Sequence, residues 1–172
     1  MAEPPLAPWH EYFVMLGTAS ATLLGAMFVV VSIGIGFLTR DRAAQIGTFL
    51  TATVVHLSSI LFGSLLTMVP GLGRAWFGGI VTTAALVGLA YSLRQVVGFT
   101  QHPGTEGSDW FWYGALPPVG YALLVAAGIG TLFGLPVSLD LFAAALAALL
   151  LAGIRNAWDM IVFLVTQPRS PD

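Results

Sequence analysis

One short run of this sequence, Arg155-Asn156-Ala157-Trp158-Asp159, places a base and an acid four residues apart inside a long apolar stretch. On a helix this spacing brings the two side chains to one face, where they can form an ion pair. A charge in the middle of a bilayer costs about 3 kcal/mol or more, so such groups face a bundle interior and pair. Two roles remain open. The pair, with Asn156, fixes the helix register, or it contacts a proton, an anion or a substrate.

His56 is the other ionisable candidate, near the middle of a second apolar stretch. A neutral imidazole hydrogen-bonded to a neighbouring helix would be structural. Because histidine titrates near neutral pH, a proton relay or gate is the functional alternative. Haem ligation would need two copies of His56 from a dimer, since His10 and His102 fall near opposite membrane surfaces.

The sequence contains no complete catalytic, metal or cofactor motif. It has no cysteine, which excludes thiolate metal sites and iron–sulfur clusters. Gly71-Leu72-Gly73 and Gly128-Ile129-Gly130 follow no strand and complete no phosphate-binding fingerprint. The loop residues His102, Glu106 and Asp109 have the chemistry of metal ligands, but their spacing is that of an ordinary polar loop. We therefore predict a protein without enzymatic activity, metal or cofactor.

Composition indicates the kind of element that must hold these residues. Of 172 residues, 57% are hydrophobic and 8% are charged, and the mean hydropathy is +0.88. Soluble domains carry about 25% charged residues, so the lipid bilayer is the expected surrounding of this chain. The net charge of −2 offers no basic surface for nucleic acid.

Five apolar stretches are long enough to cross a hydrocarbon core of about 30 Å, which takes about 20 residues of helix. They cover about 12–38, 45–69, 75–99, 111–133 and 141–166. Backbone polar groups in lipid must be satisfied within each segment, which favours helices. We thus predict an all-α fold, an integral membrane bundle of five transmembrane helices forming one domain over 1–172. Pro117 and Pro118 should kink the fourth stretch or make its first turns irregular.

Small and polar residues recur at helical spacing in three of the stretches. Helices in lipid associate through close packing of small side chains. The packing candidates are Gly17, Ala21 and Gly25 in the first stretch, Ser59 and Gly63 beside His56 in the second, and Ala148 and Ala152 in the fifth. These faces predict tight helix contacts, within the bundle or between protomers, with a hydrated path as the alternative. The fourth stretch carries more aromatic bulk, and we expect it to face lipid or a partner.

The arginines predict the orientation of the chain. Arg40, Arg42, Arg94 and Arg169 fall on one side of the five spans, and Arg74 falls on the other. Basic residues favour the cytoplasmic side, so we expect the N-terminus outside and the C-terminus in the cytoplasm of a bacterial inner membrane. Arg40, Arg42 and Arg94 would then lie at the inner interface, where they can contact lipid headgroups.

Two segments resemble a known group of sequences. They are Trp9-His10-Glu11-Tyr12-Phe13-Val14, continuing into GTASATLLGAMFVVVS at 17–32, and GIRNAWDM at 153–160. Together they resemble a family of small bacterial multipass membrane proteins, some of which are labelled modulators of a membrane AAA protease. The resemblance covers the first stretch and part of the fifth. It implies a non-enzymatic membrane protein, and no catalytic residues carry over from it.

Three functions remain open. The first is a non-enzymatic accessory or regulatory subunit of a membrane complex that packs against helices of other copies or other subunits. The second is a small oligomeric ion or proton channel or carrier that uses His56, Arg155 and Asp159. The third is a haem- or quinone-binding redox subunit. Short loops and the lack of a complete site favour the first.

Overall fold

The computed structural model describes residues 9–34, 40–100 and 110–166, with side chains described over 9–32, 50–97 and 110–162. This part of the chain is an all-α bundle. It consists of α1 (His10–Gly34), α2 (Arg40–Thr67), α3 (Arg74–Thr100), the π-helix η3 (Trp110–Ala115), α5 (Leu116–Phe133) and α6 (Ser138–Thr166). Five helical spans here are long and apolar enough to cross a membrane, η3 and α5 together forming one of them. The prediction of a multipass helical membrane protein is confirmed.

The helices extend beyond several of the predicted spans. Helix α2 begins at Arg40 rather than near residue 45, and α6 begins at Ser138 rather than near residue 141. A hydropathy pattern locates only the part of a helix that lies in hydrocarbon, and a helix can continue into the polar headgroup layer. The predicted end of the first span, residues 35–38, lies outside the described residues.

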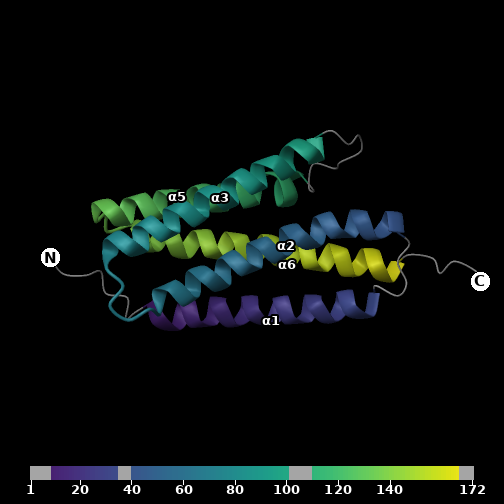
Figure 1. Cartoon of the computed structure of the whole chain (residues 1–172), viewed down its shortest axis with the longest axis horizontal. Helices are drawn as coiled ribbons and strands as arrows, with labels where there is room; N and C mark the ends of the chain where they lie inside the picture. Colours follow the sequence, from purple (N-terminus) through teal and green to yellow (C-terminus); the bar gives the residue numbers. More distant parts are fainter. Residues whose placement is uncertain (1–8, 35–39, 101–109, 167–172) are drawn as a thin grey trace, which may run out of the picture.

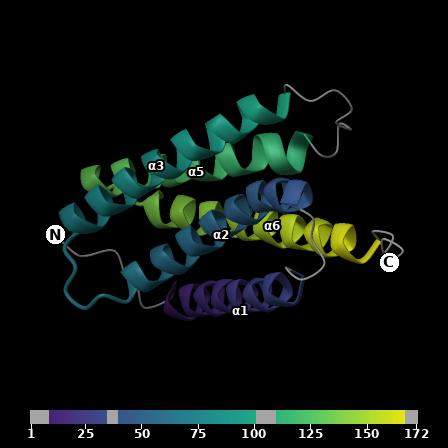
Figure 2. The same ribbon diagram turned by 45° about the vertical axis from the view of Figure 1, so that its right-hand side comes forward.

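The helices pack in an order that differs from their order in the chain. Figures 1 and 2 show α3 beside α5 at the top, α2 and α6 in the middle, and α1 at the bottom. The extensive contacts join α3 to α5, α5 to α6, α6 to α2 and α2 to α1, whereas α2 and α3 touch much less although one short turn connects them. Helix α6 is therefore central, and α1 and α3 are peripheral.

Glycines make the closest helix contacts, as expected for helices packed in lipid. A Cβ added to Gly78 of α3 would lie 2.8 Å from the carbonyl oxygen of Gly128 in α5. One added to Gly120 of α5 would lie 2.9 Å from Leu149 of α6, and one added to Gly153 of α6 would lie 2.9 Å from Leu57 of α2. Each of these three helix interfaces thus depends on a position without a side chain.

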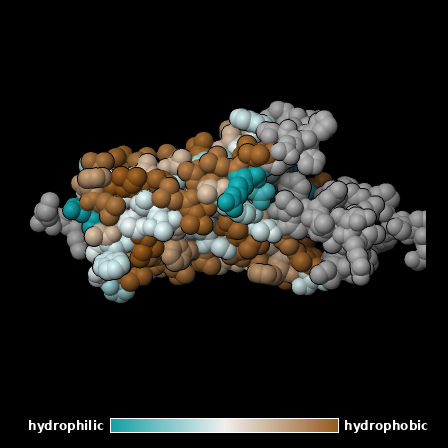
Figure 3. All heavy atoms as spheres, turned by 45° about the horizontal axis from the view of Figure 1, so that its top comes forward, coloured by the Kyte–Doolittle hydropathy of each residue, from teal (hydrophilic) through white to brown (hydrophobic). Residues whose placement is uncertain are grey.

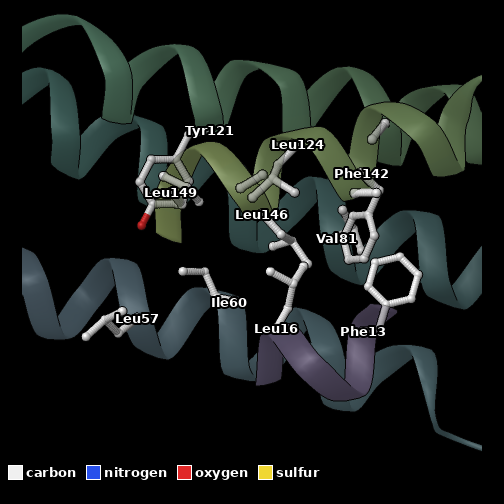
Figure 4. Packing of buried hydrophobic residues seen from close by; sticks show 14 of the residues in the cluster. Phe13, Leu16, Leu57, Ile60, Val81, Tyr121, Leu124, Phe142, Leu146 and Leu149 are labelled. Atoms are coloured by element: carbon white, nitrogen blue, oxygen red, sulfur yellow. The ribbon is translucent and has the colours of Figure 1, made fainter. Parts of the chain in front are cut away.

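Large apolar side chains fill the space between these close approaches. Phe13 of α1 and Phe142 of α6 are buried and pack with ring centroids 5.5 Å apart. Leu146 and Leu149 of α6 are fully buried in the same cluster (Figure 4). The core therefore lies along α6, which positions the polar residues on the helices around it.

The predicted packing faces are only partly used within the chain. An added Cβ at Gly17 would meet Ser64 at 3.1 Å, and one at Gly63 would meet Leu146 at 3.2 Å. Ala21 and Gly25 are exposed, and nothing lies within 4 Å of an added Cβ at Gly25. Residues spaced by four advance about 40° around a helix of 3.6 residues per turn, so the face that starts at Gly17 rotates away from α2.

The expectation that the fourth span faces lipid or a partner is wrong. Helix α5 lies between α3 and α6, and seven of its residues are buried, including Gly120, Tyr121 and Gly128. Its glycines allow the neighbouring helices to approach closely, and its aromatic residue Tyr121 points inward. In contrast, 22% of the spanning window of α1 and 28% of that of α3 are buried, so these two helices present more surface to lipid.

The irregular start predicted from the prolines is observed. The π-helix η3 ends just before Pro117 and Pro118, which occupy the first positions of α5. Proline lacks the N–H that an α-helix would donate to the carbonyl four residues earlier, at Tyr113 and Gly114. The π-helical turn contains both of these residues.

Candidate functional site

A buried polar cluster joins α2 to α5 in the middle of the bundle. The hydroxyl of Tyr121, on α5, lies 3.1 Å from Nδ1 of His56 and 3.1 Å from Oγ of Ser59, both on α2. Tyr121 is 1% exposed and His56 is 3% exposed. Figure 4 shows the phenol oxygen directed away from α5 and toward α2. The side chain of Tyr121 thus connects two helices whose backbones are not close neighbours.

The tyrosine ring passes α3 because that helix has a glycine at the crossing point. A Cβ added to Gly88 would lie 2.2 Å from Cε1 of Tyr121, which no side chain could tolerate without displacing the ring. The sequence pattern identified His56 and Ser59, but it did not identify Tyr121 or Gly88. Their pairing depends on which helices become neighbours, and single-helix spacing carries no signal for it.

The hydrogen bonds of this cluster can all be satisfied without a charge. The Ser59 hydroxyl donates to the carbonyl oxygen of Val55 at 2.8 Å. Its oxygen can then accept from Tyr121, whose oxygen in turn accepts from Nδ1–H of a neutral His56. This series of hydrogen bonds ends at a backbone carbonyl, which has no proton to donate to a further group. This arrangement fits the structural alternative for His56, a clamp between two helices.

The second cluster contains the predicted ion pair. Nε of Arg155 lies 3.0 Å from Oδ2 of Asp159, and its N–H is not aligned with that oxygen as a hydrogen bond. The Tyr113 hydroxyl donates to the same Oδ2. The Arg155 and Asp159 side chains are 39% and 27% exposed. The pair therefore forms as the spacing predicts, but it lies at the surface of this chain rather than in its interior.

Asn156 occupies a different face of α6 from the ion pair. It is 4% exposed, and its Oδ1 has no hydrogen-bond partner among the described residues. An unsatisfied buried polar atom costs about 1–3 kcal/mol. Asn156 thus faces the bundle interior and does not complete a site with Arg155 and Asp159.

Within the described part of the chain, no hydrogen bond is observed between the two clusters. Tyr113 and Tyr121 lie eight residues apart, or roughly 12 Å along the helix axis, which exceeds the reach of a hydrogen bond. Arg94 is exposed at one end of α3. The side chains of Arg40 and Arg42, and the loop residues His102, Glu106 and Asp109, lie outside the described part of the chain. No group of three or more metal-ligating side chains occurs among the residues with a described placement.

A groove on the side of the bundle was not predicted from the sequence. It has a volume of about 320 Å³ and lies between α2 and α3, with α5 and α6 forming its floor. The residues lining it are Val54, Val55, Ser58, Ser59, Phe62, Gly63, Leu66, Val81, Ala84, Ala85, Tyr121, Leu124, Phe142 and Leu146. It exists because α2 and α3 diverge after their short connecting turn. Figure 3 shows a mostly hydrophobic surface over the described helices.

Comparison with known proteins does not assign a family. No protein-family model, curated protein or solved structure matches this chain. The resemblance of Trp9–Ser32 and Gly153–Met160 to the small bacterial multipass family therefore remains a hypothesis.

Proposed function

We propose that this chain is a non-enzymatic accessory or regulatory subunit of a membrane complex, which acts by packing its helices against those of partner chains. The observation that carries the proposal is the exposure of Arg155 and Asp159. Both lie within the spanning window Ser138–Val162 of α6, yet their side chains are 39% and 27% exposed. Because exposure of a charged pair to hydrocarbon is costly, a neighbouring helix that covers the pair would be stabilised there.

The surface around the pair suits a partner helix. Leu151, Ile154 and Trp158 are 56%, 44% and 60% exposed, and with Arg155 they repeat at helical spacing along one face of α6. A partner could pack on the three apolar side chains and contact the ion pair between them. The polar contact would fix the register of the partner, as interhelical polar contacts in membranes do.

A second surface on α1 offers a different kind of contact. Thr18, Ala21, Thr22 and Gly25 are exposed and small. The hydroxyls of Thr18 and Thr22 donate to carbonyl oxygens of their own helix, each at 2.8 Å. No polar group therefore needs water on this face, and another backbone could approach it closely. The partners of these faces are second copies of this chain, other membrane subunits, or both.

The proposed location is a bacterial inner membrane, with the N-terminus outside and the C-terminus in the cytoplasm. The arginine distribution supports this orientation, because Arg40, Arg42, Arg94 and Arg169 fall on one side and Arg74 on the other. A modulator of a membrane protease, as the resemblance implies, would belong to the same class of subunit.

The rival functions have less support in this geometry. A channel or carrier using His56, Arg155 and Asp159 needs a hydrated path, whereas His56 is buried and its hydrogen-bond chain ends at a carbonyl. A haem or quinone site needs access to His56, whose Nδ1 is already engaged by Tyr121. Ion or proton flux through purified protein in liposomes that is lost in Asp159→Asn would favour the channel. A Soret band in the pure protein would favour the haem form.

Site-specific crosslinking in native membranes tests the accessory function. A photoreactive phenylalanine analogue is placed at Ile154, beside the ion pair, and at Val87 of α3 as a control; Val87 is 68% exposed. The proposal expects one discrete protein adduct from position 154 and only lipid adducts from position 87. Adducts at neither position, or the same adducts at both, would refute it. The mass of the adduct separates a second copy from a different subunit.

A further inference from the structure

We propose that the groove between α2 and α3 binds one hydrocarbon chain of a membrane phospholipid, whose phosphate is held by Arg74. This site lies on other helix surfaces than the partner faces of α1 and α6, so it does not depend on the accessory function. Three features support it: the dimensions of the groove, the polarity of its lining, and the position of Arg74 on α3, two helical turns before the first groove residue of that helix.

The dimensions of the groove suit a slender chain better than a helix. Its lining residues on α2 extend from Val54 to Leu66, which is about 18 Å at 1.5 Å per residue, and its wall on α3 is about 6 Å long, from Val81 to Ala85. Its volume is about 320 Å³. A helix with side chains is about 10 Å wide, so a single turn of it, about 5.4 Å long, takes about 420 Å³. A hydrocarbon chain is thinner, with carbon contacts at about 3.5–4.0 Å.

The lining of the groove is complementary to an apolar ligand. Eleven of the fourteen lining residues are apolar, and the polar ones are Ser58, Ser59 and Tyr121. Ser59 and Tyr121 already make the hydrogen bonds of the buried cluster, and Ser58 is exposed at the rim. No lining group is left buried and unsatisfied, so a chain without polar atoms can fill the groove at no hydrogen-bonding cost. The groove lies within the spanning helices, where lipid chains surround it.

Arg74 provides the complementary charge for the phospholipid headgroup. It begins α3 at the end of the bundle where the α2–α3 turn lies, and it is exposed. No ion pair of Arg74 occurs among the described residues, and its guanidinium lies against Gly134 of the α5–α6 turn, with Nη1 2.5 Å from an added Cβ there. Trp76 beside it is 73% exposed, as interfacial tryptophans are.

The spacing between the cation and the groove matches a phospholipid. Arg74 and Val81, the first groove residue of α3, are seven residues apart, or about 10 Å along the helix. One leaflet has a headgroup layer of about 5–8 Å over hydrocarbon about 15 Å deep. A phosphate at Arg74 therefore places its acyl chain at the level of Val81 and Ala85.

The test is photo-crosslinking with a phosphatidylglycerol that carries a diazirine in its acyl chain, mixed into phosphatidylcholine vesicles holding the purified protein. Two substitutions probe the site: Ala84→Phe fills the groove from its exposed rim, and Arg74→Gln removes the cation. Their matched controls are Ala90→Phe, exposed on the same helix outside the groove, and Arg94→Gln, exposed at the other end of α3. Circular dichroism establishes that every variant is folded.

The expected result is adducts concentrated at 54–66 and 81–85, reduced at least about fivefold by Ala84→Phe and unchanged by Ala90→Phe. Arg74→Gln should lower the yield with phosphatidylglycerol but not with a diazirine diacylglycerol, which has no phosphate, and Arg94→Gln should lower neither. Adducts spread evenly over all exposed helix faces and insensitive to Ala84→Phe would overturn the proposal. The proposal would also be overturned if neither lipid crosslinked to the groove residues and a second copy of the chain crosslinked there instead. Loss of partner adducts at Ile154 would leave this result unaffected.

Discussion

Replacing Tyr121 with phenylalanine removes one oxygen and leaves the ring in the space that Gly88 provides. In the folded protein this oxygen lies 3.1 Å from both His56 Nδ1 and Ser59 Oγ. The substitution therefore deletes two interhelical hydrogen bonds without creating a large cavity. It measures how much the clamp between α2 and α5 contributes to the stability of the bundle.

The expected magnitude follows from the groups left behind. Interhelical hydrogen bonds in membrane proteins contribute about 0.6 kcal/mol on average and at most about 1.7. Leaving a buried donor of His56 unpaired adds up to about 1–3 kcal/mol, which a change of imidazole tautomer can reduce. We expect Tyr121→Phe to lower the free energy of unfolding by about 1–2 kcal/mol.

The assay is reversible unfolding in mixed micelles, with helix content followed by circular dichroism as the denaturing detergent is increased. Thr83→Val is the matched control, because it also removes one hydroxyl, and the Thr83 hydroxyl donates to the carbonyl oxygen of Gly79 in its own helix at 2.9 Å. A double-mutant cycle of Tyr121→Phe with His56→Leu should show a coupling of about 1 kcal/mol. A loss no greater than that of Thr83→Val, with no coupling to His56, would refute the clamp.

Three further substitutions test the packing and the partner faces. Gly88→Ala should destabilise the protein by about 1–3 kcal/mol, because its Cβ meets Tyr121 at 2.2 Å, whereas Gly79→Ala, with nothing within 4 Å, should be neutral or stabilising in the same unfolding assay. Asp159→Asn leaves the arginine of the ion pair uncompensated and should reduce the recovery of the complex crosslinked through position 154 several-fold. Equal recovery would show that the ion pair does not contribute to the interface. Gly25→Leu should leave detergent stability within about 0.5 kcal/mol of wild type but weaken association in membranes, measured by energy transfer between labelled copies and by co-purification.

The membrane architecture was predictable because it depends on a property that each segment carries alone. Few charges and five long, continuously apolar stretches favour a helical bundle, in which each segment satisfies its own backbone in lipid. The spacing of Arg155 and Asp159 likewise predicted their ion pair, since both residues lie on one helix and their geometry is local. Pro117 and Pro118 predicted an irregular start to the fourth span for the same reason.

The relations between helices were not predictable from single-segment patterns. The packing order α3, α5, α6, α2, α1 depends on shape complementarity between helices, so nothing in the spacing of α5 showed that Tyr121 points inward at Gly88. The same reasoning explains the small face of α1. The spacing of four identifies this face, but of its two glycines only Gly17 is in close contact with another helix of this chain, whereas Gly25 is not. Exposure of Arg155 and Asp159 was also unforeseen, because charged residues in membrane helices commonly face the interior of their own bundle.

We propose that this chain works as part of a larger membrane assembly through the face of α6 that carries Arg155 and Asp159. Native mass spectrometry of the protein, extracted from its own membrane into polymer-bounded lipid discs, tests this most directly. We expect a stoichiometric species heavier than the 18.1 kDa chain, which is lost in Asp159→Asn while the helix content is retained. An 18.1 kDa monomer bearing only lipid, in both wild type and variant, would contradict it.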